Sequence, residues 1–209
     1  MKRLFRLFCW LVLVGYVQWV FTQPASAGVA SDEMKATIES VLTTLQDPDL
    51  QGPEKRGERR DRLKKIIYPK FDFAEMGKRS LGSHWQRRTP EEKKAFIELF
   101  TELVETSYID AIDAYNSEKV IVGSDKQDQG FAEVSSKIVS KKGEGFAVDY
   151  KLHQSGEGWK VYDVVIENVS LVNNYRSQFN RVISKASYAE LVEKMKQKQF
   201  DSPGKKRKS

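Results

Sequence analysis

The side chains best suited to acid–base chemistry in this sequence are two histidines and a few scattered aspartates. His84 and His153 each lack a second His, Asp or Glu at metal-site spacing, so we expect structural roles and no metal ion. Asp149 and Asp163 lie in segments of alternating apolar residues, where burial would raise a carboxyl pKa toward neutrality and create a general base. No nucleophile, phosphate-binding loop or metal set accompanies them, so we expect neither an enzyme nor a cofactor.

Asp72 has another expected role, because it stands where a helix should begin. Asp72 and Glu75 have the spacing of a capping box, in which each side chain satisfies a backbone N–H of the first turn. The same pattern recurs in Thr89-Pro90-Glu91-Glu92 and in Ser187-Tyr188-Ala189-Glu190. These three segments predict three helix starts.

The spacing of the apolar residues predicts helices before and after a sheet. A period of 3.6 residues indicates helices, and a period of 2 indicates strands. The strands are separated by short Gly-containing connections, which force neighbours to run antiparallel. We therefore expect an α+β fold with a four-stranded antiparallel meander. The longer predicted helices cover residues 31–45, 91–115 and 188–198, and the predicted strands cover residues 119–122, 131–139, 146–153 and 159–167.

The long helix and the last strand carry more apolar residues than one packing face needs. In the helix, Phe96, Phe100 and Leu103 lie on one stripe, and a second stripe with Val104 and Tyr108 runs beside it. One interpretation is a well-filled core, and the other is an internal cavity for a lipid-sized ligand. Periodicity alone favours the filled core, because wide apolar faces usually pack solidly.

The net charge of +6 is concentrated at the two ends of the chain. Residues 1–27 and 201–209 together hold seven basic side chains and one acidic one, which leaves 28 of each sign between them. A protein that binds DNA or RNA normally needs a basic surface on its folded part. We therefore expect no nucleic-acid partner.

The first 27 residues have the pattern of a secretory signal peptide. A basic start is followed by an apolar run over residues 7–21 and by Ala25-Ser26-Ala27, so we expect cleavage after Ala27. An uncleaved membrane anchor is the alternative, but the run is shorter than the roughly 20 residues that span a bilayer. The only cysteine, Cys9, would be removed, which excludes disulfides and thiolate sites from the mature chain.

Three segments of the chain carry a recognisable family pattern: YPKFDFAEMGKRSLGSHW at 68–85, TPEEKKAFIELF at 89–100 and GWKVYDVVIENVSLVNNYRSQF at 158–179. Together they resemble the MlaC family, the toluene-tolerance proteins that carry phospholipid in the periplasm of Gram-negative bacteria. The resemblance extends from about Ser31 to Met195, and its most specific part is the strand-to-helix segment at residues 158–179.

The resemblance implies one α+β lipid-binding domain over residues 28–200, whose helices pack on a curved four-stranded antiparallel sheet. The shape would be the cone of nuclear-transport-factor-like folds, enclosing an apolar pocket for acyl tails. A periplasmic carrier of this kind would move phospholipid between an outer-membrane lipoprotein complex and an inner-membrane ABC transport complex, with transient contact to the membrane surface. It would thereby help to maintain the lipid asymmetry of the outer membrane.

Two alternatives remain open from the sequence. The carried lipid could be a hopanoid or isoprenoid lipid, since no residue distinguishes it from a phospholipid. An enzyme on a related cone-shaped fold would use Asp163 or Asp149 together with Tyr150 or Tyr162. Within the matching segments, apolar periodicity selects these candidate lipid-binding residues: Leu81, Phe100, Leu103, Val104, Tyr108, Val148, Tyr150, Val164, Ile166, Val169, Leu171, Val172 and Tyr175.

The basic tail at residues 201–209 follows the last apolar residue, so we expect it to be disordered. It is either a solubilising tail or a weak attachment to an anionic membrane, worth roughly 1 kcal/mol per basic residue near the surface. If it attaches, deleting residues 201–209 will weaken binding to anionic vesicles at low salt and leave bound lipid and thermal stability unchanged. Equal vesicle binding by both proteins in a sedimentation assay would leave only the solubilising role.

Overall fold

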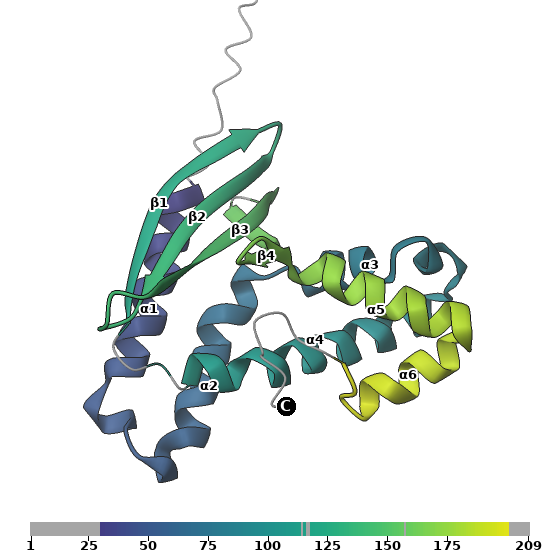
Figure 1. Cartoon of the computed structure of the whole chain (residues 1–209), viewed down its shortest axis with the longest axis horizontal. Coiled ribbons are helices and arrows are strands. Elements are labelled where there is room, and N and C mark those ends of the chain that lie inside the picture. Colours follow the sequence, from purple (N-terminus) through teal and green to yellow (C-terminus); the bar gives the residue numbers. More distant parts are fainter. Residues whose placement is uncertain (1–29, 114, 116–117, 157, 201–209) are drawn as a thin grey trace, which may run out of the picture.

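The computed structural model describes residues 30–113, 115, 118–156 and 158–200, so the expected signal peptide and basic tail lie outside the described residues. The described part contains α-helices and one antiparallel sheet, as expected (Figure 1). The helices are α1 (Ala30–Gln46), α2 (Arg56–Ile67), α3 (Phe73–Leu81), α4 (Pro90–Asp113), α5 (Leu171–Lys185) and α6 (Tyr188–Lys196). The strands are β1 (Lys119–Asp128), β2 (Phe131–Val139), β3 (Gly145–Ser155), β4 (Gly158–Ile166) and β5 (Val169–Ser170).

The sheet is an antiparallel meander in the order β1-β2-β3-β4-β5, so the expected meander is confirmed with one more strand than predicted. The additional strand, β5, pairs through two residues only. Strand β1 continues to Asp128, whereas the sequence predicted its end at residue 122. A bulge between Val122 and Asp125 allows the pairing with β2 to resume. The Gly123-Ser124 pair therefore forms an irregularity within a strand instead of a turn.

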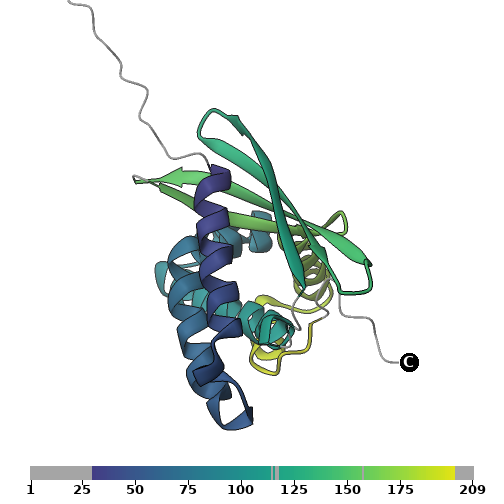
Figure 2. The same cartoon turned by 90° about the vertical axis from the view of Figure 1, so that its left-hand side faces the viewer.

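Helix α1 lies along one face of the twisted sheet, and α2 runs back beside it (Figures 1 and 2). Met34 of α1 belongs to one buried cluster with Val134 and Trp159 of the sheet. Helices α3, α5 and α6 gather at the other end of the molecule with the first half of α4, whose second half runs back toward α2 (Figure 1). The sheet is therefore covered on one face by helices, and a second, purely helical layer extends beyond it.

The helical layer has a solid aromatic core. The rings of Phe96 and Phe179 meet edge to face with centroids 5.8 Å apart, and those of Phe100 and Tyr175 do so at 5.7 Å. All four side chains are completely buried. Contacts of this geometry stabilise by about 0.5–1.5 kcal/mol each beyond the buried area.

The three predicted helix starts are confirmed. The backbone N–H of Glu75 donates to the Asp72 carboxylate at 2.8 Å, and Ser187 caps α6 in the same way at 3.1 Å. Thr89 and Glu92 form the complete reciprocal box. The expected reach of Glu75 back to Asp72 is wrong, because the Glu75 carboxylate pairs instead with Arg79 at 2.8 Å and Lys78 at 3.0 Å.

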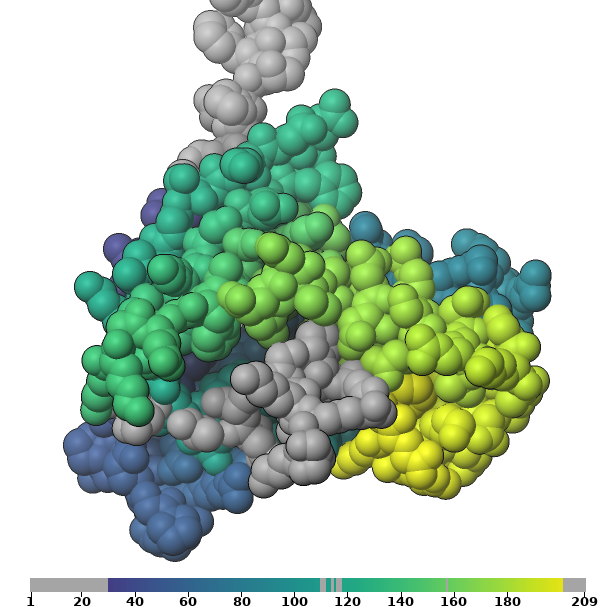
Figure 3. Space-filling view, viewed as in Figure 1, coloured from purple at the N-terminus to yellow at the C-terminus, as the bar shows by residue number. Residues whose placement is uncertain are grey.

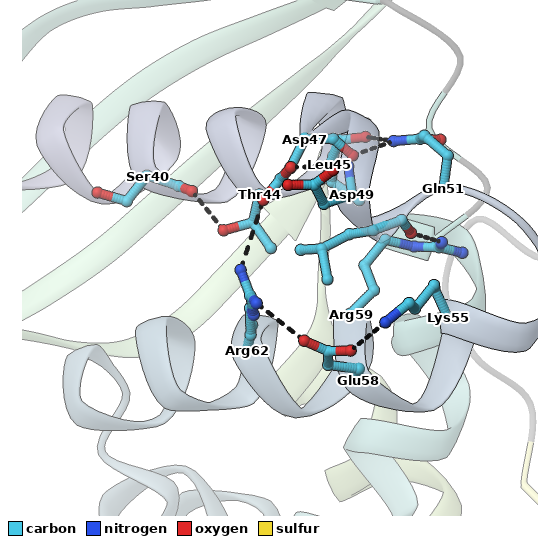
Figure 4. Close-up of polar contacts among 11 residues, drawn as sticks. Ser40, Thr44, Leu45, Asp47, Asp49, Gln51, Lys55, Glu58, Arg59 and Arg62 are labelled. Carbon is cyan, nitrogen blue, oxygen red and sulfur yellow. Dashed lines mark hydrogen bonds and ion pairs between the residues drawn. The ribbon is translucent and has the colours of Figure 1, made fainter.

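Polar contacts close the turn between α1 and α2 (Figure 4). The Asp47 side chain accepts the N–H of Asp49, and the Gln51 amide donates to the carbonyl of Leu45 at 2.9 Å. Arg59 of α2 donates to the carbonyl of Leu50 at 2.6 Å. These bonds satisfy a carbonyl near the end of α1 and backbone groups of the 3-10 turn Pro48–Leu50 that follows it.

Asp163 connects the sheet to the helical layer. Its carboxylate is 5% exposed and accepts the Ser170 hydroxyl at 2.6 Å and the backbone N–H of Val172 at 3.0 Å. Ser170 itself caps α5 through the N–H of Asn173. The carboxylate therefore lies at the N-terminus of α5, where a negative charge is stabilised by the helix dipole. This position explains its burial without any catalytic role.

Replacing Asp163 should destabilise the fold, because two partners lose a charge-assisted hydrogen bond. We expect Asp163→Ala to lower the free energy of unfolding by about 3 kcal/mol in urea denaturation. Asp163→Asn should cost less, since its amide oxygen still accepts the N–H of Val172. Equal stability of wild type and Asp163→Ala would contradict this anchoring role.

Candidate functional site

A cavity of about 460 Å³ opens between the sheet and helices α1, α2 and α4. Ligand pockets typically span about 300–1,000 Å³, so the cavity is large enough for a small molecule or a lipid tail. Figure 3 shows the surface hollowed beneath the strands. The walls are mostly apolar and comprise Met34, Thr37, Ile38, Val41, Leu42, Leu45, Lys64, Ile67, Tyr68, Phe71, Phe73, Met76, Val104, Glu105, Tyr108, Ile109, Ile112, Tyr115, Glu118, Val120, Ile138, Phe146, Val148, Tyr150, Val164, Ile166 and Leu171.

The periodicity of each element explains why its apolar side chains face this space. On α4, Val104, Tyr108 and Ile112 recur every four residues and so lie on one side of the helix. On the sheet, Val148 pairs with Ile166 and Tyr150 with Val164, so side chains two residues apart share the face toward the cavity. Three helices and one sheet face thus contribute one stripe each.

An aspartate at the end of α4 holds this wall to α2. The Asp113 carboxylate, 4% exposed, pairs with Arg59 at 2.6 Å, Arg56 at 2.8 Å and Arg60 at 3.3 Å. Burial raises the pKa of Asp113, but the arginines outweigh burial and hold it below its usual range. The carboxylate stays ionised and fixes the crossing of the two helices.

Seven of the residues selected from the sequence surround the cavity. They come from the second half of α4, from the facing strands and from the start of α5. Their contact with a ligand stays a prediction. These residues are Val104, Tyr108, Val148, Tyr150, Val164, Ile166 and Leu171.

The other six lie outside the wall of this cavity. Five are buried in the core between α3, α4, α5 and α6, and the sixth, Val169, is 46% exposed on β5. Helical periodicity identifies an apolar stripe but not which neighbour covers it. The first stripe of α4 therefore packs in a filled core, and only the second reaches the cavity. The five core residues are Leu81, Phe100, Leu103, Val172 and Tyr175.

The sequence selection missed the contributions of α1 and of the segment after α2. Ile38, Val41 and Leu42 on α1 line the cavity, and so do Phe71 and Phe73 before and within α3. The apolar stripe of α1 was visible in the sequence as an amphipathic helix. Nothing in its pattern indicates that this helix shares a cavity wall with α4, because the wall residues of the two helices lie about 70 positions apart in the sequence.

The buried tyrosines of the wall are neutral. Burial raises the pKa of Tyr108 far above its usual value, and the nearby Tyr175 adds to the shift. Burial also raises the pKa of Tyr150. The Tyr108 hydroxyl has no hydrogen-bond partner among the described residues and is itself buried. The interior wall thus offers no negative charge from these phenols.

The aspartates and histidines considered for catalysis lie elsewhere. Neither Asp149 nor Asp163 is part of the cavity wall. His153 bonds to the Asp72 carboxylate at 3.0 Å, and His84 bonds to the Asn180 side chain at 2.9 Å. Both histidines therefore connect elements of the fold.

The part of the chain that the structure describes has neither a metal-binding cluster nor a membrane-spanning helix. There, no group of three or more His, Cys, Asp or Glu side chains is placed to hold a metal ion. None of the described helices combines the length and apolar character needed to cross a bilayer.

Comparisons with known proteins agree on one family. The protein-family model described as "MlaC protein" matches residues 35–197 of this chain. The intermembrane phospholipid transport system binding protein MlaC of Haemophilus influenzae is 26% identical, covering 80% of this chain and 78% of that protein. Toluene tolerance protein ttg2D of Pseudomonas putida is 27% identical, covering 74% and 73%. A solved phospholipid-binding protein from Ralstonia solanacearum, in complex with a phospholipid, has a TM-score of 0.72 at 29% identity, covering 82% of this chain and 97% of that one.

Comparing alanine substitutions of two leucines, one in the filled core and one in the cavity wall, tests where the core ends. Leu103, 2% exposed in the core, should lose about 2–5 kcal/mol of unfolding free energy on substitution by alanine. Leu42 is half-buried and lines the cavity, so Leu42→Ala should remove fewer contacts and cost about 1 kcal/mol or less. Urea denaturation measures both. Similar losses would mean that Leu42 also lies in a filled core.

Proposed function

Because this chain belongs to the MlaC family, we propose that it is a lipid carrier that holds phospholipid acyl tails between the sheet and helices α1, α2 and α4. The observation that carries the proposal is the cavity, about 460 Å³ with walls that are mostly apolar. The phospholipid-bound relative from Ralstonia solanacearum has the same fold and supports the choice of ligand. The name of the Haemophilus relative supports transport between membranes.

The physical need for such a carrier follows from the hydrophobic effect. Each methylene moved into water costs about 0.8 kcal/mol, so an acyl tail of about fifteen methylenes costs on the order of 12 kcal/mol. A lipid therefore leaves a bilayer readily only if another apolar surface receives it. An apolar cavity beneath a curved sheet provides that surface, and the transfer itself requires no bond-making residue.

The location and partners follow from the family and from the N-terminal pattern. We propose export by the signal peptide at residues 1–27 and function in the periplasm. The carrier would exchange lipid with an outer-membrane lipoprotein complex and with an inner-membrane ABC transport complex. The intermembrane role in the name of the Haemophilus relative supports this placement.

The alternatives are less well supported. The enzyme hypothesis required Asp163 or Asp149 as a general base in the pocket, and neither lines the cavity. Asp163 is instead bonded to Ser170 and Val172. A hopanoid or isoprenoid ligand would suit the same apolar walls, and lipid analysis of the purified protein distinguishes it from phospholipid.

Filling the cavity should reduce lipid binding several-fold without unfolding the protein. Val41 lies on α1 and lines the cavity, so the larger side chain of Val41→Trp would occupy space that acyl tails need. We expect phospholipid to be extracted from wild type purified from a membrane-containing host. We expect several-fold less from Val41→Trp, with transfer between vesicles reduced equally. Mass spectrometry and a fluorescent-lipid transfer assay measure the two effects.

Glu39→Trp is the matched control, because it places the same side chain at an exposed position of the same helix. Its lipid content and transfer rate should equal those of wild type. Wild-type protein that carries no lipid and transfers none would contradict the carrier proposal. A Val41→Trp variant with normal lipid content would show that the lipid binds elsewhere.

A further inference from the structure

One part of the otherwise apolar wall is polar and charged. Among the described residues of the wall, the charged side chains are Lys64, Glu105 and Glu118. Lys64 of α2 and Glu105 of α4 form an ion pair, with the Lys64 ammonium nitrogen 2.5 Å from a Glu105 oxygen. The Tyr68 hydroxyl donates to the other oxygen of Glu105. We refer to Lys64, Tyr68 and Glu105 as the polar corner.

The two donors of the polar corner are held in place by the fold. Lys64 and Tyr68 lie one helical turn apart where α2 ends, so their side chains share one face. The Tyr68 ring packs edge to face on Phe73 with centroids 5.2 Å apart, which orients its hydroxyl. An ammonium group and a phenol therefore converge on one point beside the cavity.

The charges within the polar corner are strongly coupled. Burial raises the pKa of Glu105, but the hydrogen bonds from Lys64 and Tyr68 outweigh burial, so the net pKa is lowered. Burial and the Glu105 carboxylate both raise the pKa of Tyr68, which keeps its proton available for donation. Lys64 and Glu105 are 34% and 24% exposed, so both are accessible to a ligand.

Stability alone does not account for an ion pair at this position. A partly exposed pair contributes little net free energy, because desolvation offsets most of the attraction. Apolar residues would extend the hydrophobic wall at lower cost. The polar corner does, however, have the groups that recognise an anion, since lysine and a phenol both donate hydrogen bonds to phosphate oxygens.

We propose that Lys64 and Tyr68 form a subsite for the phosphate of the bound lipid, and that Glu105 competes with this phosphate for the same two donors. The inference rests on the proposed lipid-carrier function, because it takes the cavity to hold acyl tails. A phosphate in the polar corner takes the hydrogen bonds that Glu105 accepts, and the Glu105 side chain turns toward solvent. The competition lowers the net gain from the head group, so the lipid is recognised yet leaves readily.

The neighbouring charges on α4 and after α6 fit this exchange. Lys198 lies close enough to lower the pKa of Glu105, and it pairs with Glu102 at 3.2 Å. A second ammonium group, paired with Glu102, thus lies near the polar corner. It offsets the negative charge that a phosphate adds beside Glu105.

The test compares two fluorescent lipids with identical acyl chains, phosphatidylglycerol and diacylglycerol, on delipidated protein. We expect wild type to prefer phosphatidylglycerol. Lys64→Met should weaken phosphatidylglycerol binding about tenfold, as for the loss of one charge-assisted hydrogen bond, and leave diacylglycerol unchanged. Glu105→Gln should have the opposite effect, with tighter phosphatidylglycerol binding and slower release to acceptor vesicles. This gain cannot result from misfolding.

Two neighbouring substitutions are matched controls. Lys65→Met removes an exposed lysine next to Lys64, and Glu98→Gln removes an exposed carboxylate two turns before Glu105 on the same helix. Neither residue lines the cavity, so both variants should bind the two lipids as wild type does. If the control variants change phosphatidylglycerol binding as Lys64→Met and Glu105→Gln do, the changes result from general surface charge. That result would overturn the proposed subsite.

The remaining outcomes separate the two proposals. Equal wild-type affinity for phosphatidylglycerol and diacylglycerol overturns the phosphate subsite while the carrier function stands. Binding of neither lipid contradicts the carrier function itself. Inorganic phosphate titrated alone distinguishes the source of the anion. One combination of results would assign the polar corner to free phosphate and make the lipid assignment wrong. In that case wild type binds inorganic phosphate, Lys64→Met does not bind it, and wild type binds the two lipids with equal affinity.

Discussion

The packing of Phe96 and Phe100 on α4 against Tyr175 and Phe179 on α5 is the contact on which the rest of the structure depends. It fixes the first half of α4 in a solid core, so the second half extends beneath the sheet at a defined distance. Close-packed interiors tolerate few voids, and their side chains lock one another in place. The cavity next to this core stays open because contacts outside the cavity hold the surrounding helices and strands in place.

Two buried aspartates also hold the filled core and the elements around the cavity in place. Asp163 joins β4 to the start of α5, and Asp113 joins the end of α4 to three arginines of α2. Each carboxylate is buried and fully paired, so its removal would leave uncompensated partners. The half-buried residues of the wall, such as Val41 and Leu42, pack against fewer protein atoms and contribute less to stability. The walls can therefore be specialised for a ligand, because other contacts hold the fold together.

The segment that most resembles the MlaC family in the sequence serves the fold more than the site. Asp163 and Ser170 organise the strand-to-helix connection, and Trp159 is buried with α1. Of its apolar residues, Val164, Ile166 and Leu171 line the cavity. A family signature of this kind identifies the architecture that creates the cavity. The chemistry of the polar corner comes from other elements, α2 and the second half of α4.

The sequence by itself determined the local structure and the family. Capping at Asp72, Thr89 and Ser187 and the change of period from 3.6 to 2 are local signals, because each depends on residues a few positions apart. Only the tertiary structure decided which apolar stripe faces a void. Leu103 and Val104 are neighbours with similar side chains in the same buried cluster, yet only Val104 also lines the cavity. The difference arises from the direction in which α4 crosses α1, α2 and the sheet, and contacts between distant segments set that direction.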